Sequence, residues 1–252
     1  LLMDFLPHPG ETQFLRFMKA NYLALFPELL SQSQFNRRVR SLRLLVEELR
    51  KHWACQLGVG LHGAFILDTK PVPVLSYKRS KKHSDFAGSA NYGYCASRKM
   101  KYFGYKLVML STLNGIPSLY ELVPANTDER AGADTILPFL QNCDILADKG
   151  FIGDEWQTKH LNSHGNRIWT PKRSNQHIQN SQAFDRWLNG RRERIEGVFN
   201  QLQNTGRNIE HLLRKTVIGL ATHVIAKVTS LTLRILLREL FDVDVQSFSY
   251  IS

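Results

Sequence analysis

The chain has 252 residues, enough for one large domain or two small ones, and its hydrophobic content of 43% is that of a globular protein. Its net charge of +11 indicates a polyanionic partner, either nucleic acid or an anionic membrane surface. Three cysteines, no two of them spaced like metal ligands, argue against a zinc site and fit a reducing compartment: Cys55, Cys95 and Cys143.

Neither end of the chain is expected to enter a membrane. The first residues, LLMDFLPHPG, lack the basic segment and the following apolar segment of a signal peptide. The most apolar late stretch, residues 216–237, is interrupted by His223, Lys227 and Arg234. Charged side chains are costly inside a bilayer, so we expect a packed helix or helix pair there.

Residues 11–53 are expected to be helical and basic. One helix would end at Pro27, and Ser33 can cap a second helix that carries Arg37 and Arg38. The short turn PELLSQS between them allows a helix-turn-helix, and a small helical bundle with a solvated basic face is the alternative. The apolar face of the second helix is predicted to consist of Phe35, Val39, Leu42, Leu45, Val46 and Leu49.

The glycines of LGVGLHG match the dinucleotide fingerprint G-x-G-x-x-G, but their context does not. That motif needs a strand before it and a helix after it, whereas here a helix precedes and the strand AFILDT follows. We therefore expect a glycine-rich linker and then a strand that Asp68 closes. Pro71 and Pro73 should keep the next segment out of the centre of a sheet.

Residues 77–106 form a basic segment with interleaved tyrosines and a single acid, Asp85. Basic and aromatic side chains together favour a nucleic-acid surface, through phosphate neutralisation and base stacking. A solvated loop beside a sheet is the alternative. The cations are Lys78, Arg79, Lys81, Lys82, Arg98, Lys99, Lys101 and Lys106.

The remaining segments alternate between strand and helix patterns. YFGYKLVMLST and SLYELVPA flank an Asn-Gly turn and predict a hairpin. A helix (DERAGADTILPFL), a strand (CDIL), a helix ended by Gly165, a strand (NRIWTPK) and a helix from Ala183 to about Asn204 follow. This order predicts an α/β fold with a mixed sheet. His160 and His164 have a metal-ligand spacing, but without an H-E-x-x-H motif we expect structural or surface roles.

Three acidic residues stand out by position. Asp68 and Asp148 each follow an apolar strand, and Glu196 lies in the basic helix NGRRERIEGVFNQLQ. If they converge, they repel one another unless cations are present, and their oxygens suit Mg²⁺ or Mn²⁺. Two such ions would support phosphoryl chemistry. In the alternative, both aspartates are turn acids and Glu196 pairs with Arg192 within its helix.

Four blocks carry a resemblance to a known family: FILDTKPVPV, YGYCASRKMKYFGYKLVML, ILADKGFIGDEW and RRERIEGVFNQL. They resemble, in this order, the signature blocks of bacterial insertion-sequence transposases of the DDE type, which have a ribonuclease-H-like catalytic fold. The match is closest to the group named after insertion sequence nine-eighty-two and covers nearly the whole chain. It implies that Asp68, Asp148 and Glu196 are the catalytic, metal-binding triad and hold two Mg²⁺ or Mn²⁺ ions.

Positions near Glu196 agree with the family pattern only in part. Related families place an Arg four residues before the Glu, which Arg192 fits. They also place a Tyr and a Lys where this chain has Asn189 and Gln203, so those two DNA contacts do not carry over. In this group the full-length chain starts further upstream, which implies a DNA-binding segment before the first residue given.

The resemblance implies a DNA transposase that hydrolyses phosphodiesters at insertion-sequence ends and transfers the freed ends into target DNA. The expected domains are an N-terminal helical DNA-binding region, 1–55, and a ribonuclease-H-like catalytic domain with C-terminal helices, 56–245. A metal-dependent nuclease that does not join strands, and an inactive DNA-binding derivative, are the alternatives.

The partners implied are double-stranded DNA, at the terminal inverted repeats and at the target, and a second copy in a homodimer. We expect the protein to work in the bacterial cytoplasm, at the nucleoid, and to have no membrane partner. The expected DNA contacts are Arg37, Arg38, Lys78, Arg79, Lys81, Lys82, Arg98, Lys149, Arg191 and Arg192.

Overall fold

The computed structural model describes residues 1–6, 8, 10–75, 84–95, 98–174, 176, 179–204, 208–209, 215–243 and 245. The chain forms two compact units. A helical unit comprises Leu1–Leu57, Ser80–Ala87 and Gln201–Ser252, and a sheet unit comprises Gly58–Arg79 and Gly88–Asn200. The expected domain boundary at 55/56 lies close to the start of the sheet unit. The C-terminal helix, which we expected in the catalytic domain, groups with the N-terminal helices instead.

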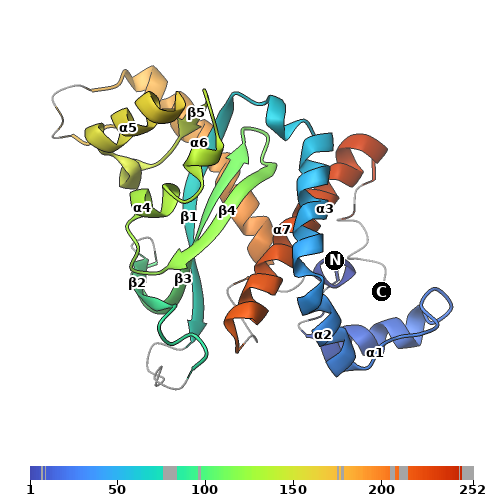
Figure 1. Ribbon diagram of the computed structural model, residues 1–252. Coiled ribbons are helices and arrows are strands. Elements are labelled where there is room, and N and C mark those ends of the chain that lie inside the picture. The colour runs from blue at the N-terminus through green and yellow to red at the C-terminus, as the bar shows by residue number, and fades with distance from the viewer. Residues whose placement is uncertain are drawn as a thin grey trace. The chain divides into compact units, whose positions relative to one another are not determined.

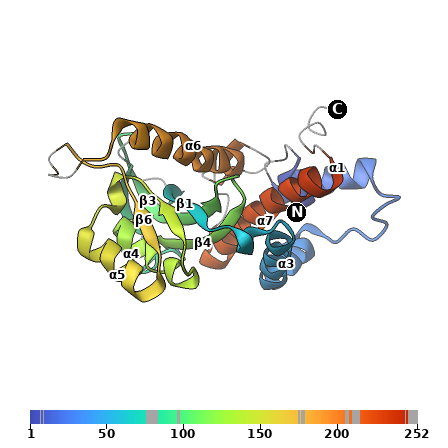
Figure 2. The ribbon, with the colours of Figure 1, turned by 90° about the horizontal axis from the view of Figure 1, so that it is seen from above.

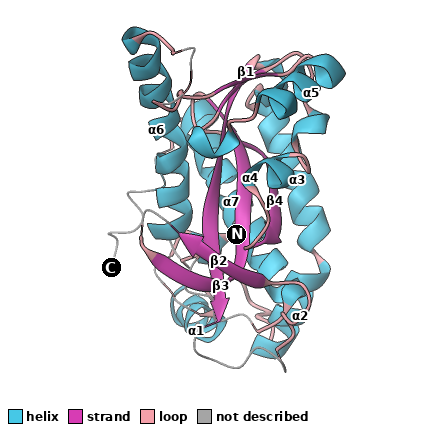
Figure 3. Cartoon of the chain, turned by 90° about the vertical axis from the view of Figure 1, so that its left-hand side faces the viewer, coloured by secondary structure: helices cyan, strands magenta, loops and turns pink. Residues whose placement is uncertain are grey.

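The sheet unit is built on a mixed sheet of six strands in the order β2-β3-β1-β5-β6, with β4 also paired to β3 (Figure 1). β1 is parallel to β5 and β5 to β6, whereas the pairs of β3 are antiparallel. The two longest strands, β1 and β3, run side by side (Figure 3). The strands are β1 (Ala64–Leu75), β2 (Asn91–Cys95), β3 (Met100–Thr112), β4 (Pro117–Pro124), β5 (Asp144–Leu146) and β6 (Arg167–Trp169).

Helices cover both faces of this sheet. Figure 2 shows α6 on one side of the strands and α4 and α5 on the other. On the first side, the Phe199 ring lies 5.6 Å from Lys70 Nζ of β1. On the second, a Cβ added at Gly132 would lie 3.0 Å from the Val108 side chain of β3, so α4 approaches the sheet closely. The helices are α4 (Glu129–Ala133), α5 (Asp154–His164), α6 (Gln182–Asn204) and the 3₁₀ turns η2 (Val59–Leu61), η3 (Leu137–Phe139) and η4 (Lys149–Phe151).

The predicted α/β class is confirmed, and the mixed sheet flanked by helices is consistent with a ribonuclease-H-like domain. Within the sheet unit the predicted order of strands and helices is found, with the short strand β2 added inside the segment expected to be irregular. The helix predicted over DERAGADTILPFL is shorter, being α4 followed by the 3₁₀ turn η3.

The prediction that Asp68 closes the first strand is wrong, because β1 continues through both prolines to Leu75. Proline cannot donate a backbone hydrogen bond, so it needs a strand edge that is unpaired. The short β5 pairs only with Ala64, Phe65 and Ile66 of β1. Beyond these residues β1 has β3 on one side alone, and its prolines are tolerated although the strand is central in the sheet order.

The helical unit contains η1 (Leu2–Asp4), α1 (Glu11–Asn21), α2 (Gln32–Ser41), α3 (Arg43–Gln56) and α7 (Val217–Phe241). The cap of α2 is Ser31, which forms a capping box with Gln34, rather than Ser33 as predicted. Residues 22–31 connect α1 to α2 and exceed the usual turn of a helix-turn-helix. Because α3 packs along α7, this unit is a helical bundle (Figure 1).

The predicted apolar face of the second helix is only partly buried. Phe35 packs against a small core of Met3, Phe14 and Met18. The helix breaks at Leu42, and α3 then buries Arg50 and Ala54, leaving several leucines of the predicted face exposed: Leu42, Leu45 and Leu49.

Among the described residues, α7 is the one helix long and apolar enough to cross a membrane by length and composition. Its most apolar window, with a mean hydropathy of 1.4, is 72% buried within the structure. A core helix meets the same test, which agrees with the packed helix expected from the charged residues of this stretch.

Asn166 anchors the start of β5, the strand that leads to Asp148. Its side chain is 0% exposed, donates to the carbonyls of Leu137 (3.2 Å) and Leu140 (2.9 Å), and accepts from the Cys143 amide (3.1 Å). Asn166→Ala should lower the free energy of unfolding by about 3 kcal/mol, because three buried backbone groups lose their partner.

Urea denaturation of Asn166→Ala, compared with the wild type, measures this loss. Asn162→Ala, at an exposed position of α5, is the matched control and should change stability by less than about 0.5 kcal/mol. Equal effects of the two substitutions would contradict the anchoring role of Asn166.

Candidate active site

The register of two parallel strands places Asp68 and Asp148 side by side. The last residue pair between β1 and β5 is Ile66 with Leu146. Asp68 and Asp148 each lie two residues beyond that pair, so continuing the register sets them opposite each other. Side chains two residues apart share a face of the sheet, so both carboxylates project to the same side.

A backbone amide from the next segment holds each aspartate. The Thr69 N–H donates to Asp68 Oδ1 at 2.7 Å, and the Gly150 N–H donates to Asp148 Oδ1 at 2.6 Å. Asp148 is thereby the N-cap of η4. Both side chains therefore have one oxygen, Oδ1, fixed by a backbone amide.

Burial and charge act together on Asp68. The pKa of its carboxyl is raised to about 7: burial is the largest cause and the carboxylates of Asp148 and Glu129 add to it, while the Thr69 N–H and the Arg192 guanidinium lower it. The protein alone therefore does not fully compensate the negative charge of ionised Asp68.

Helix α6 brings one cation to these acids. Arg192 lies on the buried stripe of α6, between Leu188 and Ile195. Its Nη2 is 4.0 Å from Asp148 Oδ2, and its side chain is 19% exposed. Its Nε is buried and has no hydrogen-bond partner among the described atoms. We expected Arg192 as a DNA contact, and the structure adds a contact with Asp148.

Glu196 is not grouped with the two aspartates. It is exposed on α6, one turn after Arg192. Within the part of the chain that the structure describes, no three His, Cys, Asp or Glu side chains are placed so as to hold one metal ion. The sequence predicted that all three acids converge; the structure brings two together, and the role of Glu196 stays a prediction.

Glu129 is an acid near this site that the sequence analysis missed. Its Oε1 accepts a hydrogen bond from Thr69 Oγ1 at 2.9 Å. Burial raises its pKa, and Asp148 raises it further. An acid in the first turn of a helix is common for reasons of helix polarity alone, so the motif DER gave no functional signal.

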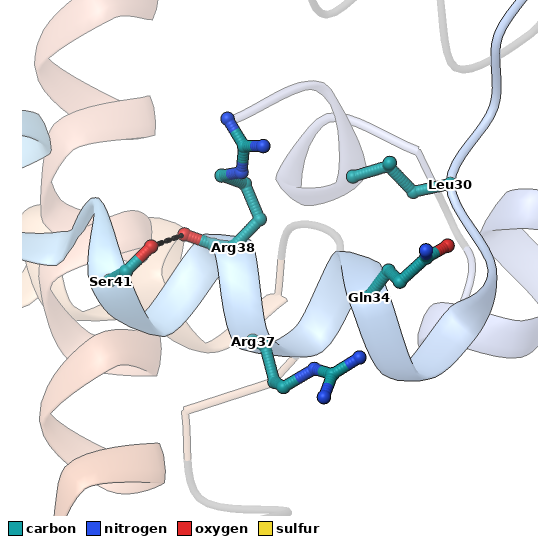
Figure 4. Close-up of a pocket in the computed structure, with 5 residues that line it drawn as sticks. All are labelled: Leu30, Gln34, Arg37, Arg38 and Ser41. Carbon is teal, nitrogen blue, oxygen red and sulfur yellow. Dashed lines mark hydrogen bonds between the residues drawn. The ribbon is translucent and has the colours of Figure 1, made fainter.

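The predicted DNA contacts are distributed over both units. In the sheet unit, Arg98, Lys149 and Arg191 are exposed. In the helical unit, Arg37 and Arg38 line a pocket of about 330 Å³ with Leu30, Gln34 and Ser41, and their guanidinium groups point away from each other (Figure 4). Lys78, Arg79, Lys81 and Lys82 lie outside the described residues.

The two histidines with metal-ligand spacing lie in α5, away from the aspartates in sequence. His160 is buried, and its Nε2 is 2.7 Å from Asp134 Oδ1. Trp156 Nε1 donates to the same oxygen at 2.7 Å. These bonds tie α5 to the segment after α4, as expected for a structural histidine.

Most of the sheet unit lies in a segment that matches a known protein family. Residues 60–217 match the model of a family described as the transposase DDE domain. The chain belongs to this family. No curated protein and no solved structure matches the chain. The matched segment covers more than half of the 252 residues and includes Asp68, Glu129, Asp148 and Glu196.

Membership of the DDE transposase family confirms the family-level resemblance of the four sequence blocks. It makes transposition the general function of this domain and DNA its general substrate.

Proposed function

We propose that the chain is a DNA transposase that cleaves phosphodiesters at the ends of its insertion sequence and joins the freed 3′ ends to target DNA. Within the family, we place it in the group named after insertion sequence nine-eighty-two. The observation that carries the proposal is the pair Asp68, on β1, and Asp148, just beyond β5, which lie opposite each other when the register of these parallel strands of a DDE domain is continued.

The residues present fit a divalent cation. Hard carboxylate oxygens are the ligands of Mg²⁺ and Mn²⁺. The pKa of Asp68, raised to about 7 by burial and by neighbouring carboxylates, indicates a demand for positive charge. Asp68 and Asp148 would hold the ion, with Glu196 as the third acid of the triad. A bound pair of ions supplies Lewis acidity and an activated water for phosphodiester hydrolysis.

The remaining groups of the site orient and balance the acids. The amides of Thr69 and Gly150 fix one oxygen of each aspartate, so the second oxygen of each would bind the ion. Arg192 offsets part of the negative charge, and its partly exposed guanidinium can donate to a DNA phosphate. Lys149, beside Asp148, is exposed and can bind a flanking phosphate.

DNA binding is proposed for the cationic residues of both units. The basic segment 77–106, α2 with Arg37 and Arg38, and α6 with Arg191 and Arg192 would bind the terminal repeats and target DNA. A homodimer that pairs two element ends, working at the bacterial nucleoid in the cytoplasm, completes the proposal.

A cleavage assay tests the function. Labelled duplexes carrying the ends of the element are incubated with the chain in Mg²⁺ or in EDTA, with and without target DNA. We expect cleavage in Mg²⁺ alone and joined products when target DNA is present. Equal cleavage in EDTA would refute the metal mechanism. Cleavage without joined products would favour the nuclease alternative, and binding without cleavage would favour an inactive derivative.

The basic segment gives a separate prediction from the sequence. Replacing Lys78, Arg79, Lys81 and Lys82 with Ala should weaken binding to every DNA sequence. It should also flatten the log–log salt dependence by up to ~3–4 units, because each phosphate contact contributes about −0.9. Fluorescence anisotropy across a salt series measures the slope.

Lys159→Ala is the control for this series, because Lys159 is an exposed residue of α5 whose Nζ lies 3.4 Å from Asp134 Oδ2, just after α4. It should leave the slope unchanged. If the quadruple variant and the wild type give parallel lines, the segment does not touch phosphate. The binding surface then moves to α6 around Arg191, Arg192 and Arg194.

A further inference from the structure

Glu129 contacts both segments that hold the candidate catalytic aspartates. Its Oε1 accepts the hydrogen bond of Thr69 Oγ1, and its Oε2 lies against Gly150, where an added Cβ would collide with it. Thr69 and Gly150 are the residues whose backbone amides donate to Asp68 and Asp148. The Glu129 carboxylate therefore contacts both residues whose backbone amides hold the candidate catalytic aspartates.

The fold places Glu129 there, because α4 begins at this residue. The side chain of Asp128 caps α4 by accepting from the Arg130 amide at 3.0 Å, which fixes the direction of the first turn. Gly132 lets the helix approach Val108 on the sheet. Since β5 stops at Leu146, the space beside Thr69 of β1 is open to a side chain from α4.

The charges around these residues favour a cation. Arg192 lies near Asp148, and Lys106 acts on Glu129 while its Nζ donates to the Thr127 carbonyl at 2.8 Å. Burial, followed by the charge of Asp148, raises the pKa of Glu129. Among the described residues, three partly buried carboxylates lie near one another, and an ion bound beside them would compensate negative charge.

We propose that Glu129 is a fourth acidic residue of the active site, a positioning residue whose negative charge strengthens divalent-cation binding by Asp68 and Asp148. The inference rests on the proposed function. No three acidic side chains in the described chain are grouped closely enough to ligate one ion. Glu129 therefore acts from outside the ligand set, through its charge and through its contacts with Thr69 and Gly150.

The test is Mn²⁺ binding to the DNA-free chain, measured by calorimetry. Glu129→Gln removes the charge and keeps an oxygen that accepts from Thr69, so the fold should survive, as melting in EDTA will verify. We expect its affinity for Mn²⁺ to fall about 10–100-fold, as for other partners outside the ligand set. Glu121→Gln, the same change at an exposed position of β4, should bind as the wild type does.

Two further variants separate the possible failures. Glu129→Asp keeps the charge and should bind Mn²⁺ more tightly than Glu129→Gln; equal loss in both would overturn the inference. Wild-type affinity in Glu129→Gln would also overturn it, because a purely structural role predicts that result. Asp148→Asn should lose Mn²⁺ binding. If it does not, the metal site of the proposed function fails; if it does while Glu129→Gln binds normally, only the role of Glu129 fails.

Discussion

Replacing Asp148 with asparagine should reduce Mg²⁺-dependent cleavage of element-end DNA by at least about 1000-fold while leaving DNA binding intact. Asparagine keeps the oxygen that accepts from the Gly150 amide at 2.6 Å but removes the negative charge that a metal needs. Metal-based stabilisation of a phosphoryl transition state is several kcal/mol, and about 4 kcal/mol corresponds to 1000-fold in rate. Asp68→Asn and Glu196→Gln should have the same effect.

Cleavage of labelled duplexes and fluorescence anisotropy of DNA binding measure the two properties separately. Asp154→Asn on α5 and Glu193→Gln on α6 are matched controls at exposed positions and should cleave normally. A variant that retains near-normal cleavage identifies a residue that is not a ligand. Glu196→Gln is the most informative of the three, because Glu196 is exposed and is not grouped with the two aspartates.

Asp68→Asn should stabilise the metal-free protein at pH 8 and leave it almost unchanged at pH 4. The pKa of Asp68 is about 7 in the folded chain, against about 3.9 in an unfolded chain. Between these values the folded state binds more protons than the unfolded state. Stability is therefore lost as the pH rises through this window, by at most about 4 kcal/mol. Asparagine does not titrate and avoids that loss.

Urea denaturation in EDTA at the two pH values measures the difference, with Asp154→Asn as the control that should show no pH-dependent gain. The same change in stability at pH 4 and pH 8 would contradict the raised pKa of Asp68. Adding Mg²⁺ at pH 8 should stabilise the wild type by mass action and Asp68→Asn much less, since a ligand of the native state raises its stability.

The order of strands and helices could largely be predicted from local patterns in the sequence. The errors of that prediction, at β2 and at the end of β1, have physical causes. β2 was missed because NYGYC has no apolar run, and its backbone pairing with β3 from Asn91 to Cys95 holds it in the sheet. The extension of β1 past Pro71 and Pro73 was missed because it depends on the length of the neighbouring strand β5. Where β5 has ended, that edge of β1 is unpaired, and a proline nitrogen without a hydrogen to donate is tolerated there. A partner strand's length cannot be inferred from the proline-containing segment itself.

The two aspartates stand out in the sequence because each follows an apolar run, where an unpaired carboxylate is costly, and their role as metal ligands stays a prediction. The sequence by itself determined the family, through the order of four blocks that the match over residues 60–217 supports. The surroundings of Asp68 follow from the fold alone: the contact between Arg192 and Asp148, and the position of Glu129 between Thr69 and Gly150. These contacts join residues far apart in the chain, and they depend on strand register and on which helix face meets the sheet, neither of which sequence spacing fixes.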